Sequence, residues 1–450
     1  MNRRFAMVNK LVPLTEFDKV GDEMYGMMAE LFPICRSITG EGVRQTLKIL
    51  QKRLPLKIVE IPSGTLAFDW TIPEEWNIND AYILDPDGKK IVDFKKNNLH
   101  ILGYSEPVDV KLTLSELKRH LYSLPEQPDA IPYLTSYYKK RWGFCLCHKD
   151  LIKLKEGIYT VKIDSKIEPG CLTFGECIIP GEEDEEVLLS CYICHPSMAN
   201  DSISGAVLTA FLGQWLATKK RRFSYRLIFI PETIGAIAYL SLNKDRMLAK
   251  TYAGLVTSFV GDSGFFRYKK SRRGNSVIDR VAEHTMKYRL QNYKIVDYYP
   301  HLGSDERQYC SPGFNLPVGL LTRSPYMGYP EYHTSLDNMS FVSAKNLAES
   351  FSLYADIFSV LEMNRIYVNQ VMFCEPQLSK RDLYSTLGSQ KNQAEERLKL
   401  QWILNYSDGN LDLLSIAEKM GVPIGELGDA VVELVRTGLI KEKSPPCQQR

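Results

Sequence analysis

Two of the seven histidines stand beside residues with which they could hold a metal ion. His195 follows an apolar run in ICHPSMANDSISG, six residues before Asp201, and His333 lies in the turn-rich segment PEYHTSLDN. Imidazole and carboxylate groups bind zinc through lone pairs at about 2 Å. A single histidine at the end of a strand is more often structural. The prediction of a metal site therefore depends on whether the fold brings these three residues together.

Glu232, in FIPETIG, is the candidate general base. It directly follows an apolar run, where loss of solvent can raise the pKa of a carboxyl group toward neutrality. The same position also suits a glutamate that interacts with the N-terminus of a helix. Asp262, Asp305 and Asp337 are further acids that could orient a metal-binding histidine or cap a turn.

The segment from about 171 to 365 predicts the scaffold for these side chains. Unbroken apolar runs (VLLSCYI, YRLIFI, AGLVTSFV, PVGLLTRS) alternate with helical patterns, which is typical of a mainly parallel sheet covered by helices on both faces. Ligands of such sheets lie beyond the carboxyl ends of the strands. His195, Glu232 and Asp262 follow three successive predicted strands, so we expect them at the same edge of the sheet.

The remaining segments predict two more domains. Residues 64–170 contain short β-type runs and the hairpin signal DPDGKK, and residues 377–450 contain three short helical patterns typical of a winged helix. Two helical patterns joined by CRSITGEG lie in residues 16–63. We therefore predict a discontinuous α/β catalytic domain (16–63 and 171–372), an inserted β-rich domain (64–170) and a C-terminal winged-helix domain (377–450).

Composition narrows the class of protein. Of the 450 residues, 44% are apolar and 24% charged, and the net charge is only +2, which predicts a soluble folded protein without general attraction to nucleic acids or membranes. No run reaches the roughly 18 apolar residues of a membrane span, and MNRRFAMVNKLVPLTEF is not typical of a signal peptide. We expect a cytoplasmic protein with mostly reduced cysteines. The Cys191–Cys194 pair is interpreted as packing in a buried strand.

The segments resemble, in their order, the co-catalytic zinc aminopeptidases of the M28-like clan. NDSISG is similar to that family's Asp-Asn-x-Ser-Gly motif, PETIGA to Glu-Glu-x-Gly, GSDERQYCSPGFNLP to its Ser-Asp stretch and YHTSLDN to its His-Thr-x-x-Asp. CRSITGEG and FDWTIPEEW resemble signatures of a narrower bacterial aminopeptidase-like branch (DUF4910/DUF2172 type). That branch has an inserted β domain and a C-terminal winged helix. The resemblance covers essentially all of residues 16–450.

The resemblance implies roles for individual residues. It makes Asp201 the metal-bridging aspartate, Glu232 the catalytic glutamate and His333 a ligand. Thr233 and Ser258 stand where the family has carboxylate ligands, although Asp262, four residues after Ser258, could substitute for the second. His195 is also closer to Asp201 than the family's first histidine is to that aspartate. The departures favour one zinc ion over two, with a water in the fourth position, and they leave open whether Glu232 is a base or a ligand. The expected zinc ligands are His195, Asp201 and His333.

The predicted function is zinc-dependent hydrolysis of an amide bond in a small peptide-like or aminoacylated substrate, with metal-activated water and Glu232 as general base. The alternative is an inactive aminopeptidase-like protein that binds a ligand and signals through its winged helix, which the two missing carboxylates favour. The candidate substrate contacts are Arg36, Asp305, Tyr326 and Tyr332.

The predicted partners follow from charge. The expected recognition helix of the winged helix, PIGELGDAVVELVRTG, carries Glu426, Asp429 and Glu433 against Arg436 alone. An acidic helix opposes the phosphate attraction on which nucleic-acid binding depends. We therefore expect no nucleic-acid and no membrane partner. Self-association through the winged helix or the β domain is the expected alternative.

Overall fold

The computed structural model describes residues 18–383 and 391–443, and it divides the chain into two compact units. Among the described residues, the larger unit comprises residues 18–279 and 292–351, and the smaller comprises residues 280–291, 352–383 and 391–443. Residues 1–17, for which the sequence predicts no signal peptide, lie outside the described residues. Across the described ranges, no helix combines the length and the apolar character needed to cross a membrane.

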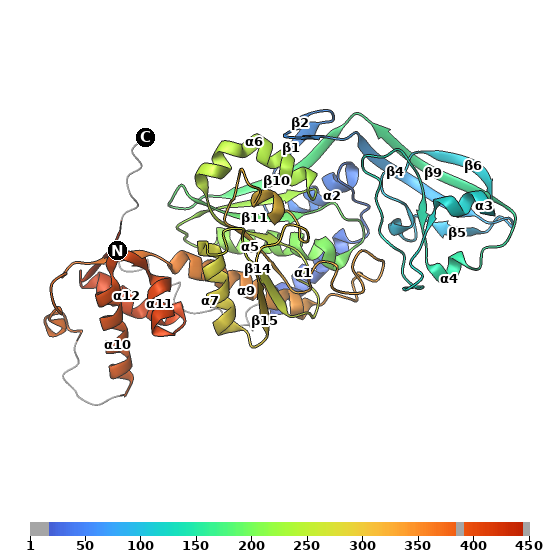
Figure 1. Cartoon of the computed structure of the whole chain (residues 1–450). Coiled ribbons are helices and arrows are strands. Elements are labelled where there is room, and N and C mark those ends of the chain that lie inside the picture. The colour runs from blue at the N-terminus through green and yellow to red at the C-terminus, as the bar shows by residue number, and fades with distance from the viewer. Residues whose placement is uncertain (1–17, 384–390, 444–450) are drawn as a thin grey trace. The chain divides into compact units, whose positions relative to one another are not determined.

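An eight-stranded sheet forms the centre of the larger unit (Figure 1). Its four central strands run parallel to one another, as predicted, and the flanking pairs β1–β10, β10–β12 and β14–β16 are antiparallel. In sheet order, the strands are β1 (Lys57–Pro62), β10 (Cys171–Ile179), β12 (Ser224–Ile230), β11 (Glu186–Tyr192), β13 (Thr251–Thr257), β16 (Val318–Thr322), β14 (Phe266–Lys269) and β15 (Tyr293–Val296).

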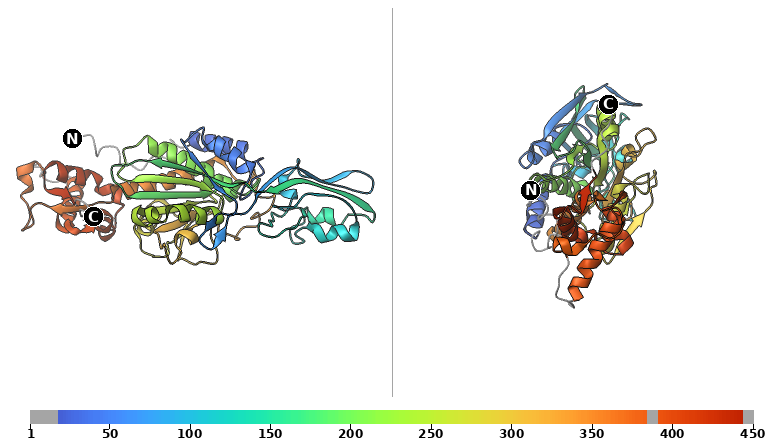
Figure 2. Two further views of the ribbon diagram at one scale, coloured as in Figure 1. Left: turned by 90° about the horizontal axis from the view of Figure 1, so that it is seen from above. Right: turned by 90° about the vertical axis from the view of Figure 1, so that its left-hand side faces the viewer.

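Helices on both faces explain why the central strands are mainly apolar and almost entirely buried (Figure 2). Every residue of β11 is buried, which requires cover on both sides of the sheet. The helices α5 (Gly205–Ala217) and α6 (Ile234–Lys250) follow β11 and β12. The two crossovers run in opposite directions along the sheet, so right-handed connections place these helices on opposite faces. Two further helices of this unit, α1 (Asp18–Leu31) and α2 (Glu41–Leu50), pack on α5 and β10.

The inserted domain contains an antiparallel sheet of four strands. In sheet order these are β5 (Lys90–Asp93), β4 (Glu75–Leu84), β9 (Ile158–Glu168) and β6 (Val108–Thr113). The predicted hairpin at DPDGKK joins β4 to β5, and the Asp85 carboxylate accepts the main-chain N–H groups of Asp87 and Lys89 there. One segment of the insert returns to the α/β core, since Ile131 and Ser335 exchange hydrogen bonds.

The smaller unit contains a winged helix. Its helices α10 (Lys391–Tyr406), α11 (Leu413–Met420) and α12 (Gly428–Arg436) accompany a three-stranded sheet. Gly421, at φ 72°, ends α11 in the turn that the sequence indicates. The sheet order is β18 (Asp408–Asp412), β17 (Ile366–Asn369) and β19 (Ile440–Glu442), so the module includes a strand before residue 377. The end of the long helix α9 (Ala344–Met363) and most of α7 (Val277–Arg289) also belong to this unit.

His284 is expected to make the smaller unit sensitive to acid. Its Nε2 accepts the main-chain N–H of Ile424 at 3.0 Å, and burial, with smaller contributions from Lys287 and Arg280, lowers the pKa of His284 to about 4. The unfolded chain takes up a proton near the ordinary pKa of 6.5, so the contact stabilises the fold fully above that pH. We expect about 2–3 kcal/mol to be lost as the pH falls from about 6.5 through about 4. Calorimetry of the full chain should show a smaller acid shift in His284→Gln, and an equal shift would contradict this assignment.

Candidate metal centre

The three predicted ligands meet at the carboxyl edge of the central sheet. His195 follows β11, Asp201 lies in the helical turn η4 (Ala199–Ser204) before α5, and His333 lies in the loop after β16. One ligand atom from each residue lies within 4.8 Å of the others. Asp201 Oδ2 is 3.1 Å from His333 Nε2. Within residues 18–383 and 391–443, this is the one group of three or more such side chains compact enough to hold a metal ion.

The charges of the triad suit a cation. Burial lowers the pKa of His195 to about 4, so its imidazole is neutral and offers a lone pair at physiological pH. Burial acts to raise the pKa of Asp201, but the neighbouring His195 and His333 hold that pKa below its usual range. Asp201 is 1% exposed, and within the described residues its Oδ2 has no hydrogen bond of good geometry, although His333 Nε2 lies 3.1 Å away. A cation held between this oxygen and the two imidazoles would balance the buried carboxylate charge.

A hydroxyl network occupies the other oxygen of Asp201. The Tyr192 hydroxyl donates to Asp201 Oδ1 at 2.6 Å, and it also lies 2.6 Å from Ser258 Oγ and 3.0 Å from the Tyr326 hydroxyl. Ser258 is the position at which the resemblance implies a carboxylate ligand. The serine instead orients the tyrosine that fixes Asp201.

Two further acids hold the turn that carries Asp201. The Asp337 carboxylate accepts the main-chain N–H groups of Asn200 at 2.7 Å and Asp201 at 2.9 Å. Asp262 Oδ2 accepts from the Asn200 side-chain amide at 2.7 Å, and its Oδ1 accepts from Ser324. Asp262 therefore supports the turn and is not part of the triad.

Glu232 faces the triad from the end of β12. Its Oε2 is 3.8 Å from His195 Nε2, and its Oε1 accepts from Ser304 Oγ at 2.9 Å. Burial, followed by the charges of Asp305 and Asp201, raises the pKa of Glu232 well above its usual value. Asp305 lies behind it and accepts the Thr233 main-chain N–H at 2.7 Å, and burial raises the pKa of Asp305 to about 7.

The inserted domain supplies one wall of the centre through Tyr133. The Tyr133 ring lies 5.2 Å from the rings of both His195 and His333, and its main-chain N–H donates to the His333 carbonyl at 2.8 Å. The Tyr332 ring stacks on the imidazole of His333, with the two ring centres 4.0 Å apart. Neither Tyr133 nor Tyr192 is predicted from the sequence. The former carries no local signal, and the latter is hidden in an apolar strand.

The four candidate substrate contacts have different places in the structure. Tyr326 and Tyr332 lie beside the triad, and Asp305 lies behind Glu232. Arg36 is 2% exposed and lies behind His195, where Nε donates to the His195 carbonyl at 2.8 Å and Nη1 donates to the carbonyl of Leu31. This placement makes Arg36 a support for the main chain at the site.

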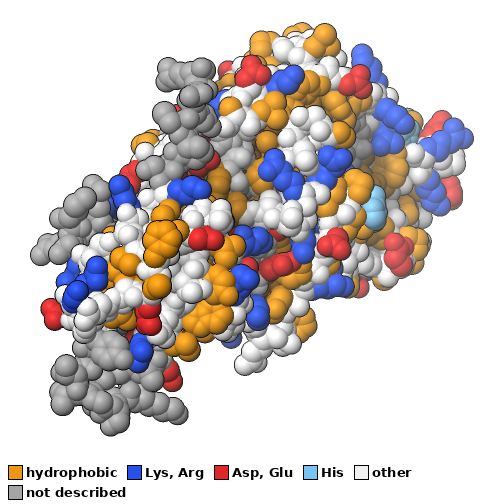
Figure 3. Space-filling model, turned by 60° about the vertical axis from the view of Figure 1, so that its left-hand side comes forward, with side chains coloured by type: hydrophobic (Ala, Val, Ile, Leu, Met, Phe, Trp, Pro, Cys, Tyr) orange, Lys and Arg blue, Asp and Glu red, His pale blue; other side chains and the backbone are white. Residues whose placement is uncertain are grey.

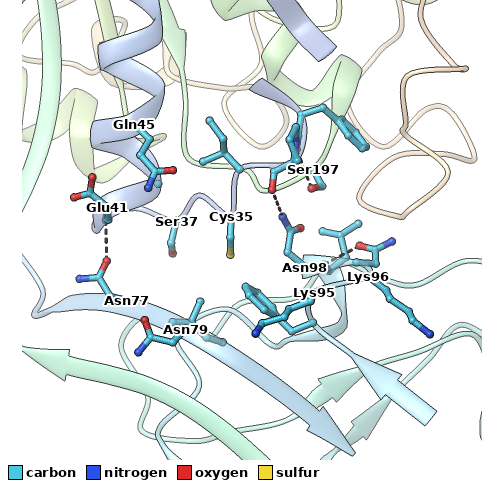
Figure 4. Close-up of a pocket in the computed structure, with 18 of the residues that line it drawn as sticks. Cys35, Ser37, Glu41, Gln45, Asn77, Asn79, Lys95, Lys96, Asn98 and Ser197 are labelled. Carbon is cyan, nitrogen blue, oxygen red and sulfur yellow. Dashed lines mark hydrogen bonds between the residues drawn. The ribbon is translucent and has the colours of Figure 1, made fainter. Parts of the chain in front are cut away.

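A cavity of about 930 Å³ adjoins the centre without being lined by the triad (Figure 4). Its wall includes Ser197 and Ser335, each two residues after a predicted ligand. The side chains of Cys35 and Ser37, in the CRSITGEG loop, point into it between α2 and β4.

Gly205, the first residue of α5, is required by close packing under the Asp201 turn. A Cβ at this position would lie 2.2 Å from the Thr257 carbonyl oxygen. We expect Gly205→Ala to destabilise the protein by about 1–3 kcal/mol and to weaken metal binding, because the turn must shift. Gly26→Ala in α1 is the control, since its Cβ would meet nothing within 4 Å and a helix gains stability from alanine. Urea unfolding measures both, and equal stabilities would contradict the packing argument.

Comparison with known proteins places the chain in a family. The profile described as "Domain of unknown function (DUF4910)" matches residues 25–364, and a winged helix-turn-helix profile matches residues 365–442. A Clostridium acetobutylicum protein named "Putative polysaccharide biosynthesis protein with aminopeptidase-like domain" is 47% identical over 423 residues, covering 94% of this chain and 97% of its own. A crystal structure from the same organism, titled "putative peptidase", has a TM-score of 0.90 at 45% identity and covers 96% of this chain and 98% of its own.

More distant structures share the fold. The zinc aminopeptidase of Bacillus subtilis has a TM-score of 0.55 at 11% identity, covering 75% of this chain and 94% of its own. The M28 peptidase precursor of Shewanella amazonensis has a TM-score of 0.52 at 12% identity, covering 77% and 97%. These matches confirm the predicted aminopeptidase-like α/β fold. The chain belongs to the DUF4910 family and carries a C-terminal winged helix.

Proposed function

We propose that the protein is a zinc-dependent hydrolase of an amide bond, with the metal held by His195, Asp201 and His333. The observation that carries the proposal is the convergence of one buried carboxylate and two imidazoles, with their ligand atoms within 4.8 Å of one another and Asp201 Oδ2 3.1 Å from His333 Nε2. Tetrahedral zinc with ligands at 2.0–2.1 Å separates neighbouring ligand atoms by about 3.3 Å. The residues therefore fit this metal. The name of the Bacillus subtilis neighbour, a zinc aminopeptidase, supports the same choice.

The hydrogen bonds at Asp201 favour a single ion. A bridging aspartate needs one oxygen for each of two metals, but Tyr192 already donates to Asp201 Oδ1. Thr233 and Ser258 offer no carboxylate at the positions where the resemblance implies the other ligands. Oδ1 is therefore the less available oxygen of Asp201, and two carboxylate ligands are missing, so we propose one zinc ion per chain.

Glu232 is proposed as the general base. Zinc, when bound, supplies a Lewis acid that acidifies water and polarises the scissile carbonyl. Glu232 accepts the proton of the attacking water at Oε2, since Oε1 is held by Ser304 Oγ. A cation in the triad opposes the rise in the pKa of Glu232 that burial causes. Tyr326 and Tyr332 border the position of the substrate.

The proposed substrate class is a small peptide-like or aminoacylated molecule. The aminopeptidase-like fold supports amide hydrolysis, and the name of the Clostridium relative includes polysaccharide biosynthesis. Together they support an aminoacylated or amidated sugar among the substrates.

A protein partner, rather than a nucleic acid, is proposed for the winged helix. Residues 380–450 contain ten Lys/Arg and ten Asp/Glu, so this module has no excess positive charge. In α12, Arg436 is paired with Glu433 at 2.7 Å. On the face shown in Figure 3, acidic and basic side chains are interspersed. Salt-sensitive binding of duplex DNA by the full chain in a gel-shift assay would contradict this proposal.

The test of the proposed function is hydrolysis by the zinc-loaded full chain. Aminoacyl p-nitroanilides and N-aminoacylated hexosamines form the substrate panel. We expect turnover that stops on chelation and returns when zinc is added. Bound zinc without turnover of any substrate would instead favour the ligand-binding regulator.

A further inference from the structure

We infer that the cavity beside the metal centre is a second ligand site, which binds a hydroxyl-rich sugar carrying a carboxylate. The cavity measures about 930 Å³ and lies between the α/β core and the inserted domain. This inference goes beyond the proposed hydrolysis, because none of the triad lines the cavity.

Much of the wall comes from two sequence motifs that supply no residue of the triad. The CRSITGEG loop contributes Cys35, Ser37 and Thr39, and the end of FDWTIPEEW contributes Trp76, followed by Asn77. The two motifs are fixed to each other, since the Trp76 main-chain N–H donates to Thr39 Oγ1 at 3.1 Å. The cavity is therefore built by ordered, tightly packed segments.

Two almost fully buried polar side chains in the wall each carry an oxygen that forms no hydrogen bond within the described residues. Ser37 is 4% exposed, and within the described ranges its hydroxyl takes part in no hydrogen bond, while Figure 4 shows it directed into the cavity. Asn98 is 7% exposed; its Nδ2 donates to the Pro33 carbonyl at 3.2 Å, but its Oδ1 has no partner among residues 18–383 and 391–443. The Ser37 hydroxyl is therefore available to a polar ligand in the cavity, and Asn98 adds an unpaired oxygen within the same wall.

The remaining lining matches hydroxyl groups. Primary amides offer donors and acceptors side by side, as sugar hydroxyls require. Gln45 at the mouth and Asn79 on β4 are amides of this kind, and Figure 4 shows them on opposite sides of the cavity. Burial raises the pKa of the Cys35 thiol to about 12, so the thiol is neutral and contributes packing rather than charge.

One lysine at the rim of the cavity favours a ligand that carries a carboxylate. Lys95 lies 3.5 Å from Asp80, and Glu41 is neutralised by Arg44 and Lys48. Lys96 is exposed and forms no ion pair with any residue that the structure describes. A carboxylate on the ligand would form an ion pair with the ammonium group of Lys96.

Titration calorimetry on the metal-free full chain tests the site separately from hydrolysis. The probes are galactose with galacturonate, and glucose with glucuronate. We expect one of the two hexoses to bind. The uronate of that hexose should bind about threefold tighter at low ionic strength, because it adds one exposed ion pair with Lys96. Ser37→Val should weaken both members of that pair about fivefold, because one hydrogen bond is lost. Lys96→Gln should remove only the advantage of the uronate, and Lys111→Gln, at an exposed lysine of β6, should change nothing.

Three results would overturn the inference. No binding of any of the four sugars at millimolar concentrations would exclude the ligand class. Binding that is unchanged in both Ser37→Val and Lys96→Gln would place the sugar elsewhere. Displacement of the sugar by dialanine would assign the cavity to a peptide. Lys96→Gln alters an exposed side chain, so it remains informative if Ser37→Val does not fold.

Discussion

Zinc is expected to leave the protein when either imidazole of the triad is removed. Each of His195→Ala and His333→Ala deletes one of three protein ligands. The remaining two fall short of the three protein ligands that hold a catalytic zinc ion. We expect the affinity to fall by more than about 100-fold, the upper loss seen when only a supporting group is removed. Mass spectrometry of metals in the purified proteins should find one zinc per chain in the wild type and none in the variants.

His301→Ala is the matched control for the zinc measurement. His301 is an exposed histidine outside the triad, so its removal should leave the metal content unchanged. Two zinc ions in the wild type would contradict the single-ion proposal and would require another ligand to turn toward Asp201. No zinc in the wild type, even after zinc is supplied, would contradict the hydrolase itself.

Glu232→Gln is expected to lower kcat by about 10²–10⁴-fold while zinc stays bound. The magnitude is that of a positioned general base, which glutamine cannot replace. Glutamine keeps the shape of the side chain and can still accept the hydrogen bond from Ser304 Oγ, so the fold and KM should change little. Steady-state kinetics and metal analysis on the same preparation separate loss of the base from loss of the metal.

Glu74→Gln, at an exposed glutamate of the inserted domain, is the control for charge removal alone. Zinc lost together with activity in Glu232→Gln would assign Glu232 as a ligand. Full activity in that variant would leave the base unassigned among the neighbouring acids, of which Asp305 is the nearest candidate.

The sequence was sufficient to predict the α/β core because its signals are local. Strands buried on both faces, such as β11 and β12, appear as mainly apolar runs, and α5 and α6 separate β11, β12 and β13 clearly. The winged helix was equally readable, but its first strand, β17, was missed. That strand pairs with β18 and β19, which lie far along the chain, and a four-residue strand has no periodic signal of its own.

The candidate centre was predictable in part for the same reason. His195, Asp201 and Glu232 follow recognisable strands, so topology places them at one edge of the sheet. Tyr133 comes from a different domain, and its approach to His333 depends on docking of the insert. Arg36 was predicted as a substrate contact because a guanidinium can pair with a substrate carboxylate, whereas its hydrogen bond to the His195 carbonyl can be known only from three dimensions.

The contact between Tyr133 and His333 has a consequence for how the molecule is made. The chain leaves the α/β core after β1, forms the insert, and returns at β10, so the wall of the centre is synthesised well before His333. Closing such a long loop costs chain entropy, so contacts between residues far apart in the sequence form slowly and late in folding. The metal centre is therefore complete only when the α/β core and the inserted domain have both folded and packed together. Metal uptake would then mark the last step of folding.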